Sequence, residues 1–434
     1  MNISKEQTIT LTLKRVLFYC YLEKKSFPGA GMFTYVTFRA VVAAILALII
    51  SIWFGKYFIN WLKNKNIVET QRDEKTDPYN TLKKGVPTMG GVIIIAAILI
   101  PCLLIGKLHS VYMILMIITT LILGGVGFAD DYIKTFKKRK DGIKPITKIS
   151  FQVLLGLIVG LTLRFSPAVV INEKVDVKIE NNQEVVIKTP DVKSTRTTIP
   201  FFKNHDLNYS NLFGFMGPRA KYICGWIFFV LLTVFIVAAV SNGSNLNDGM
   251  DGMAAGNSAI IGLTLLIFAY VSSHAVLASH LDLMFIPGSE EIVVFLAAFV
   301  GALIGYLWYN SFPAQIFMGD TGSLTIGGII AVTALIIHKE LLLPILCGVW
   351  LLEILSDLDV KLFLKRGKKH RIWKKAPMHD SFRTSMEDFK KAWPNSTVTF
   401  QGDGMKQHEV KITIRFWIVT ILLAALTLLT LKIR

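Results

Sequence analysis

The chain has 434 residues, of which 53% are hydrophobic and 18% charged, and its mean hydropathy is +0.52. Soluble domains carry about 25% charged residues, so this composition excludes an ordinary soluble enzyme and a disordered chain. The 47 basic and 30 acidic residues leave a net charge of +17. On so apolar a chain, this excess can indicate nucleic acid, anionic lipid or the cytoplasmic loops of a membrane protein.

Ten apolar runs follow one another along the chain, and most approach the roughly 20 residues that a helix needs to cross a bilayer. They cover residues 39–62, 86–105, 111–129, 149–163, 222–240, 253–271, 292–309, 324–337, 341–364 and 412–431. The sequence therefore predicts an all-α integral membrane protein of about ten transmembrane helices. We expect an N-terminal periplasmic segment over residues 1–38 and a transmembrane domain over residues 39–432.

The basic residues predict the orientation of these helices. With ten crossings both termini share one side, and the loops 63–85, 130–148, 241–252, 310–323 and 365–411 lie together on the other. Lysine and arginine crowd the first, second and last of these loops. By the positive-inside rule this side is cytoplasmic, and the cytoplasmic loop 365–411 is the longest on it.

The long connection 164–221 then lies in the periplasm. Residues 175–180 and 184–188 alternate apolar and polar side chains, and residues 181–183 can form a turn. This pattern predicts a small β-hairpin-like insertion, although a partly ordered loop without chemistry explains it equally well.

Acidic residues gather at the cytoplasmic ends of the predicted helices. An Asp at the centre of a membrane helix costs about 2.5–3.5 kcal/mol, so Asp130, Asp131, Asp248, Asp251 and Asp320 need an explanation. All five fall on the side already predicted from the basic residues, which indicates one site. Two classes of protein fit: an enzyme acting on phosphates, and an ion-coupled transporter, which also needs membrane carboxylates and helices broken by glycine.

The residue types favour Mg²⁺, which one or two carboxylates hold while phosphate oxygens and water complete its shell. Neighbouring Asp130 and Asp131 diverge by about 100° on a helix, so at most one of them should touch a metal. Asp248 and Asp251 would face the same way if they were helical. Lys134 follows Asp130 at a spacing that favours an ion pair.

Other features have plain explanations. The four cysteines, Cys20, Cys102, Cys224 and Cys347, lie in apolar runs and indicate small buried side chains rather than disulfides. His379 taken alone is more often a loop histidine than a catalytic one. The basic residues are divided among membrane loops without an aromatic surface between them, which predicts no binding of nucleic acid.

Five motifs in order carry a resemblance to a known family. They are PTMGG at 87–91, DDYIK at 130–134, NLNDGMDG at 245–252, GDTGS at 319–323 and APMH at 376–379. In this order they resemble the polyprenyl-phosphate N-acetylhexosamine-1-phosphate transferases, and among these the phospho-N-acetylmuramoyl-pentapeptide transferases. The motifs span about two thirds of the chain, and the family has ten spans with its site on the cytoplasmic face.

The resemblance implies a reaction in the bacterial cytoplasmic (inner) membrane. UDP-N-acetylmuramoyl-pentapeptide would give its phospho-sugar to undecaprenyl phosphate, with Mg²⁺ as cofactor, to yield lipid I and UMP. It also suggests a homodimer. The nearest alternative in the family takes UDP-N-acetylglucosamine for surface polysaccharides.

Roles follow from the resemblance by position. Asp320 resembles the principal Mg²⁺ ligand, sometimes proposed as a nucleophile, and Asp130 and Asp131 resemble the pair that activates the lipid phosphate. His379 matches the first of the family's consecutive histidines, and the resemblance places it with Asp130, Asp131 and Asp320 among the catalytic residues. Lys148 matches a lysine that holds the diphosphate, and one of Lys83 and Lys84 matches a further basic contact. The residues that match positions at the nucleotide are Asn245, Asp248, Gly249, Met250, Asp251 and Phe317, and Asn310 matches a polar residue that lines the cleft.

The chain departs from the family after His379. Asp380 and Ser381 stand where the family commonly has two more histidines, so the roles of those histidines do not transfer. The stretch 382–410 is also longer than the resemblance predicts, and the sequence assigns no role to it or to the insertion 164–221.

Overall fold

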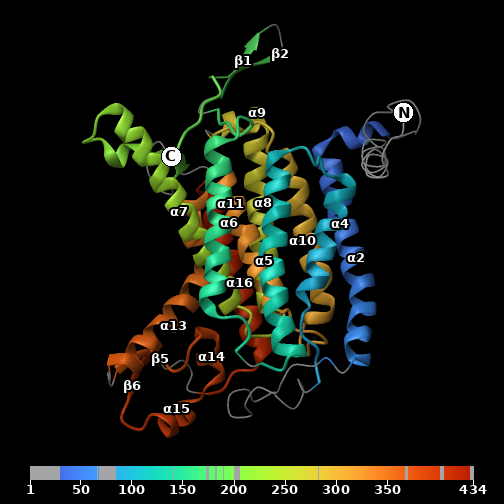
Figure 1. Cartoon of the computed structure of the whole chain (residues 1–434), viewed down its shortest axis with the longest axis vertical. Coiled ribbons are helices and arrows are strands. Elements are labelled where there is room, and N and C mark those ends of the chain that lie inside the picture. The colour runs from blue at the N-terminus through green and yellow to red at the C-terminus, as the bar shows by residue number, and fades with distance from the viewer. Residues whose placement is uncertain are drawn as a thin grey trace.

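The computed structural model describes residues 30–65, 67, 85–139, 141–172, 175–180, 183–188, 190–199, 206–281, 283–366, 370–400 and 405–430. Lys83, Lys84, Cys20 and all of the predicted N-terminal segment up to residue 29 lie outside these ranges. The described part is mostly helical (Figure 1).

Eight helices in the described part of the chain are long and apolar enough to cross a membrane. They are α2 (Val36–Asn64), α5 (Val111–Phe136), α6 (Pro145–Phe165), α7 (Pro218–Leu246), α8 (Met253–Ser273), α10 (Glu290–Asn310), α11 (Gly319–Ile336) and α16 (Glu409–Leu429). The short helix η1 (Ala30–Thr34) precedes α2. This arrangement confirms a multi-pass, all-α membrane protein.

Two predicted spans differ from ordinary crossings, so the count of ten stays a prediction. Helix α4 (Gly91–Ile105) has only 15 residues and contains Pro101. The predicted span 341–364 is broken, because η3 (Glu340–Leu342) and α12 (Leu343–Leu346) meet α13 (Gly348–Arg366) at a bend of 75°. The break falls at Cys347 and Gly348, where glycine weakens the helix.

Helix α11 is the centre of the bundle, and all of its residues from Thr321 to Ile336 are buried. Helices α4, α5 and α7 pack around it, while α10 packs on α2, α4 and α8. Glycines bring three backbones together near the start of α11. A Cβ on Gly91 would lie 2.1 Å from the Gly322 amide nitrogen, and one on Gly127 would lie 2.3 Å from the Asp320 carbonyl oxygen. Side chains at these positions would push the helices apart.

A small lobe lies beside α13 at one end of the bundle (Figure 1). It contains β5 (His370–Trp373), α14 (Met378–Arg383), α15 (Met386–Ala392) and β6 (Thr397–Phe400), and its two strands pair in parallel. The predicted loop 365–411 is therefore largely folded.

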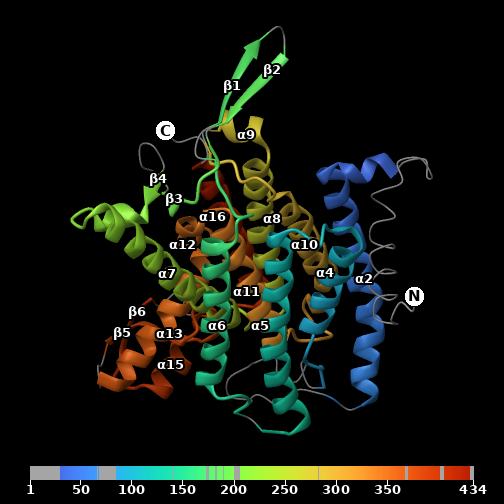
Figure 2. The ribbon, with the colours of Figure 1, turned by 45° about the horizontal axis from the view of Figure 1, so that its top comes forward.

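The opposite end carries the predicted insertion. Strands β1 (Val175–Glu180) and β2 (Gln183–Lys188) form the expected antiparallel hairpin, which projects from the bundle in Figure 2. A second pair, β3 (Arg196–Thr198) and β4 (Asp206–Asn208), leads into η2 (Tyr209–Phe213), and α9 (Ala275–His280) lies near the hairpin. Helix α2 begins and α16 ends at this same end, as an even number of crossings requires (Figure 1).

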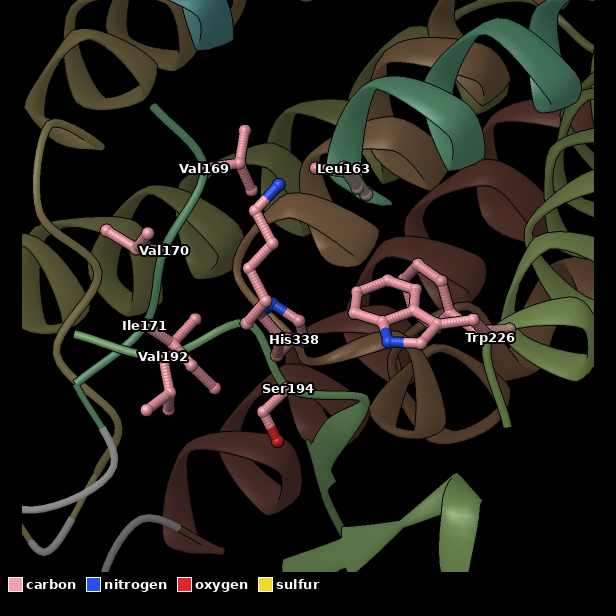
Figure 3. A pocket seen from close by; sticks show the side chains of 10 residues that line it. Leu163, Val169, Val170, Ile171, Val192, Ser194, Trp226 and His338 are labelled. Atoms are coloured by element: carbon pink, nitrogen blue, oxygen red, sulfur yellow. The ribbon is translucent and has the colours of Figure 1, made fainter. Parts of the chain in front are cut away.

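Polar contacts hold the insertion on the bundle. The Tyr209 hydroxyl donates to Glu340 at 2.9 Å, and the buried Lys339 ammonium donates to the Thr198 hydroxyl at 2.5 Å. Figure 3 shows Trp226 of α7 and His338 facing the ends of the insertion across a small pocket. The chain segment that carries the hairpin is thus anchored at the bundle's end.

Two helix N-termini at this end share a buried ion pair. Arg39 of α2 lies 2.8 Å from Glu291 of α10, and their side chains are 0% and 2% exposed. The backbone N–H of Lys107 also donates to Glu291, at 2.8 Å. A buried ion pair is stable only when both charges are paired and hydrogen-bonded. Removal of one member leaves an uncompensated buried charge.

Replacing Arg39 alone with Leu should therefore lower the free energy of unfolding by about 3–5 kcal/mol, toward the low end because Lys107 also faces Glu291. The double variant Arg39→Leu, Glu291→Leu should lose less than the sum of the two single changes. Denaturant unfolding in detergent measures both, with the exposed Arg219→Leu as the control. Additive losses would show that the two charges are not coupled.

Candidate active site

Three carboxylates meet where α5 ends and α11 begins. Ligand oxygens of Asp130, Asp131 and Asp320 all lie within 4.8 Å of one another. The two neighbouring Asp residues still point in different directions, as helical geometry predicts, and so meet different groups. Asp130 and Asp131 are buried, whereas Asp320 is 15% exposed and reaches the surface.

Asp131 holds the first turn of α11. Its Oδ1 accepts from the Asp320 N–H at 3.0 Å, and its Oδ2 accepts from the Thr321 N–H at 2.9 Å and from the Thr321 hydroxyl at 2.5 Å. First-turn N–H groups have no acceptor inside their own helix, so a carboxylate from α5 caps α11 in place of a local residue. Gly319 has a φ of +71°, and a Cβ there would lie 2.5 Å from Asp131 Oδ2.

Asp130 and Asp320 share two lysines. The Lys134 ammonium lies 2.6 Å from Asp130 Oδ2 and 3.4 Å from Asp320 Oδ2. The Lys148 ammonium, from the first turn of α6, lies 3.0 Å and 2.5 Å from the same two atoms. The expected pair between Asp130 and Lys134 is confirmed, and it belongs to a quartet of alternating charge. We call Asp130, Asp320, Lys134 and Lys148 the charge quartet.

The loop between α5 and α6 also holds Asp130 in place. Its Oδ1 accepts from the Ile143 N–H at 2.6 Å. Gly142, with a φ of +59°, lies so close that a Cβ would stand 2.4 Å from the same oxygen. The loop between α5 and α6 therefore closes over Asp130, which explains why this carboxylate has no exposed surface.

This donor set is compatible with a hard divalent cation, which prefers carboxylate oxygens. Asp131 has both oxygens on backbone and hydroxyl donors, so Asp130 and Asp320 are the better candidates to hold a metal. The expectation that no more than one of the neighbouring pair serves as a ligand stays a prediction.

The second half of the site is the turn that joins α7 to α8. Residues 247–252 form turns rather than a helix, so Asp248 and Asp251 do not share the face that their spacing would give them on a helix. Gly252 breaks the helix with a φ of +72°. Asn245 and Asp248 are half-buried, as is Gly249, whereas Met250 is buried.

Asp251 and Asn310 tie this turn to the segment that precedes Asp320. The Ala314 N–H donates to Asp251 Oδ2 at 3.0 Å, and the Gly252 N–H donates to Asn310 Oδ1 at 3.1 Å. Both side chains are 3% exposed. The Asp251 N–H in turn donates to Glu409 of α16 at 2.8 Å. Asp251 and Asn310, both predicted site residues, thus hold the site in shape by accepting hydrogen bonds from the backbone.

Backbone hydrogen bonds join the PTMGG motif to the same segment. The Phe317 N–H donates to the Pro87 carbonyl at 2.8 Å, and the Phe317 carbonyl accepts from the Gly90 N–H at 2.8 Å. The Gly91 N–H donates to the Met318 carbonyl at 2.9 Å. Phe317 is half-buried at the start of this pairing. The first and fourth motifs are therefore adjacent, although about 230 residues separate them in the chain.

His379 joins the lobe to the turn. Its ring is buried, and the imidazole edge fits against Gly249, where a Cβ would stand 2.0 Å from Nε2. Nδ1 lies 3.1 Å from Glu353 Oε1 on α13. Asp380, in one of the two positions that depart from the family, pairs with Lys375 at 3.2 Å and with Arg383 at 2.5 Å.

The motifs of the sequence did not indicate Glu353, Arg383 and Glu409. Glu353 has a side-chain exposure of 0%, and its oxygens face both the ring and the backbone N–H of His379. An acidic residue inside the apolar run 341–364 is the signal that could have found it, because such a residue needs a buried partner. All predicted site residues that the structure describes lie at this end of the bundle. Lys83 and Lys84 lie outside the described residues.

Comparisons with known proteins match this arrangement. Residues 113–338 match the family described as "Glycosyl transferase family 4". The chain is 63% identical to a phospho-N-acetylmuramoyl-pentapeptide-transferase of Bacteroides fragilis over 96% of this chain and 100% of that protein. Similar proteins of the same name occur in Bacteroides thetaiotaomicron, at 62% identity over 96% of this chain and 100% of that protein, and in Porphyromonas gingivalis, at 50% over 95% and 98%.

The surroundings of His379 predict a pH dependence of stability. Burial lowers the pKa of His379, but the carboxylates of Glu353 and Asp380 raise it more, and the net pKa lies above the usual 6.5. Protonation of His379 therefore stabilises the fold, fully below about pH 6.5, and this contribution is lost as the pH rises through the raised pKa.

The variant Glu353→Gln should show a smaller loss of melting temperature between about pH 6 and about pH 9 than the unmodified chain. Thermal unfolding in detergent at several pH values is the measurement. His370→Gln, which removes an exposed histidine of the same lobe, should leave the dependence unchanged. An identical pH profile for Glu353→Gln and the unmodified chain would contradict the role of Glu353.

Proposed function

The chain belongs to the phospho-N-acetylmuramoyl-pentapeptide transferases of glycosyl transferase family 4, and from this premise we propose its substrates and the roles of its residues. It is a membrane-embedded phospho-sugar transferase of peptidoglycan synthesis. The proposed donor is UDP-N-acetylmuramoyl-pentapeptide and the proposed acceptor is undecaprenyl phosphate. The products are lipid I and UMP.

The charge quartet is the observation that carries this proposal. It lies at the end of membrane helices, where a phosphate on a lipid and a soluble nucleotide can meet. Its two ammonium groups can bind phosphate oxygens, and its two carboxylates can hold a cation. Phosphoryl transfer needs this combination, because positioning and charge stabilisation supply most of the catalysis.

We assign Asp320 and Asp130 as the residues that would hold Mg²⁺. Their oxygens converge, and Asp320 is the exposed member of the pair. When bound, the ion supplies positive charge that neutralises the diphosphate of the donor and the charge that develops as UMP leaves.

The remaining steps belong to the chain's own residues. Lys148 and Lys134 turn from Asp320 to bind the donor's diphosphate, and the buried Asp130 keeps its contacts with both lysines and so positions them for the acceptor phosphate. An oxygen of the acceptor forms a bond to the phosphorus that carries the sugar, and the bond from that phosphorus to UMP breaks. Asp131 acts as a positioning residue, because its oxygens fix the start of α11 and hence Asp320.

The turn 247–252 and Phe317 form the proposed nucleotide side. Asn245 and Asp248 are accessible enough to contact the nucleotide, the Gly249 and Met250 backbone lies beside uracil, and Phe317 stacks on the base. Asp251 and Asn310 support these contacts from behind. We assign His379, held by Glu353, to the wall of the cleft, and Lys83 and Lys84 to its basic rim.

The chain spans the membrane several times. We infer that the membrane is the bacterial cytoplasmic one and that the site faces the cytoplasm, since Lys134, Lys148 and Lys375 lie at the site's end of the bundle. The surrounding bilayer delivers the acceptor. A homodimer stays a prediction from the family.

Two experiments separate this proposal from its alternatives. Competition between UDP-N-acetylmuramoyl-pentapeptide and UDP-N-acetylglucosamine in purified protein should favour the first donor by a large factor. A transporter would instead accumulate substrate in sealed vesicles without forming UMP. Product formation only from the N-acetylglucosamine donor would overturn the assigned substrate.

Asp320→Asn should lower the rate of Mg²⁺-dependent transfer by about a hundredfold or more, because it removes the exposed carboxylate of the quartet. Radiolabelled transfer to the lipid phosphate in detergent is the measurement. Asp388→Asn, in an exposed pair on α15, is the matched control and should keep full activity. Near-normal turnover of Asp320→Asn would remove Asp320 from the metal site.

The number of chemical steps is a separate question. If Asp320 formed a covalent intermediate, UMP would be released in an amount equal to the enzyme when the lipid phosphate is absent. Direct attack by the acceptor, which the proposal favours, predicts no such release. A stoichiometric burst of UMP in the absence of acceptor would contradict direct attack.

A further inference from the structure

A membrane-facing groove lies between α6 and α7, at the end of the bundle away from the charge quartet. Helix α6 has Lys148 of the quartet in its first turn and Arg164 in its last, about 24 Å apart along the helix axis at 1.5 Å per residue. The groove opens beside Arg164. It is therefore a separate feature from the proposed active site.

The groove forms because α6 and α7 diverge. A Cβ on Gly156 would lie 2.6 Å from the Val234 Cα, whereas one turn later a Cβ on Gly160 would lie 3.3 Å from the Val230 Cα. Beyond this point large side chains replace glycine on α6, and the N-terminal half of α7 leans away from the bundle (Figures 1 and 2). The space left between the helices has a volume of about 380 Å³, within the range of ligand pockets.

The lining suits a hydrocarbon chain. Every lining residue except Arg164 is apolar or aromatic. Most of these side chains are open to the bilayer, since Leu161 is 45% exposed, Ile227 is 54% and Leu231 is 62%. Trp226 closes the inner side of the groove, and it also faces the buried pocket shown in Figure 3.

Arg164 places a positive charge at the mouth of this apolar space. Its guanidinium lies over three rings, at 5.3 Å from the centroid of Phe165, 5.1 Å from that of Tyr222 and 4.8 Å from that of Trp226. The rings fix the position of the guanidinium but do not neutralise it. Within the described parts of the chain, no acidic side chain forms an ion pair with Arg164.

A second cation stands beside it. The Lys193 ammonium donates to the carbonyls of Arg164 and Ser166, each at 2.7 Å. Partial burial and the nearby charge of Arg164 both lower the pKa of Lys193, which indicates that the two positive charges repel each other. As with Arg164, no acidic side chain among the described residues forms an ion pair with Lys193. Two neighbouring cations without an acid, at a membrane surface, favour a bound anion.

We propose that this groove binds one anionic phospholipid of the leaflet at the hairpin end, with its phosphate at Arg164 and Lys193 and an acyl chain between α6 and α7. The charge selects the head group, and the apolar walls select a lipid over a free anion. A zwitterionic lipid of the same chain length fits the walls but lacks the net negative charge.

Native mass spectrometry of the full-length protein in detergent tests this site. The unmodified chain should retain one phosphatidylglycerol more tightly than a phosphatidylcholine with the same acyl chains. Arg164→Gln should weaken the binding of phosphatidylglycerol about fivefold and bring it close to that of phosphatidylcholine. Arg219→Gln removes an exposed arginine from the first turn of α7, outside the groove, and should change neither.

A second variant tests the groove without changing its charge. Ile227→Trp fills the space between the helices and should weaken the binding of both lipids. Excess inorganic phosphate should not displace phosphatidylglycerol from the unmodified chain.

Three results would overturn the proposal. Equal binding of the two lipids by the unmodified chain would mean that Arg164 only lies at the membrane surface. Displacement by inorganic phosphate would mean that the cations bind a free anion. A change of oligomeric mass in Ile227→Trp, with lipid binding intact, would mean that a second copy of the chain covers the groove.

Discussion

The site depends on one electrostatic constraint: Asp130 and Asp320 lie side by side in a largely apolar protein and need positive charge between them. Carboxylates removed from water are costly unless they are paired and hydrogen-bonded. Lys134 and Lys148 meet this need from α5 and α6, so three helices converge at one point. The same constraint gives the site its chemistry, because a place that requires cations between carboxylates also suits a metal ion and a diphosphate.

Contacts to the backbone hold the segment around Asp320 in place. Asp131 fixes the first turn of α11, and Gly91 and Gly127 let α4 and α5 approach that turn closely. The segment before Asp320 is held on both sides, by Phe317 against the PTMGG motif and by Asp251 beneath Ala314. Two of the predicted contact residues, Asp251 and Asn310, therefore shape the site by binding backbone N–H groups.

The two ends of the bundle differ in how their charged side chains are paired. At the site's end, acids and bases alternate and pair across helices and the lobe, as in the contacts among His379, Glu353 and Asp380. At the other end Arg39 and Glu291 form a closed pair, whereas Arg164 and Lys193 leave positive charge at the membrane surface. The first arrangement supports phosphoryl transfer, and the second supports a bound lipid.

The sequence by itself determined the class of protein, the face that carries the site and the chemical identity of its acids. Hydropathy and the distribution of lysine depend on local composition, and so do the hairpin pattern at 175–188 and the spacing of Asp130 and Lys134. What only the tertiary structure decided depends on contacts between distant segments. The 75° bend before α13, the turn at 247–252, the capping of α11 by Asp131 and the pairing of His379 with Glu353 are examples. The capping and the pairing arise because a buried polar group must find a partner wherever packing brings one, and no local pattern records that partner. The bend and the turn fall at Gly348 and Gly252, where the chain leaves the helix although the local pattern would continue it.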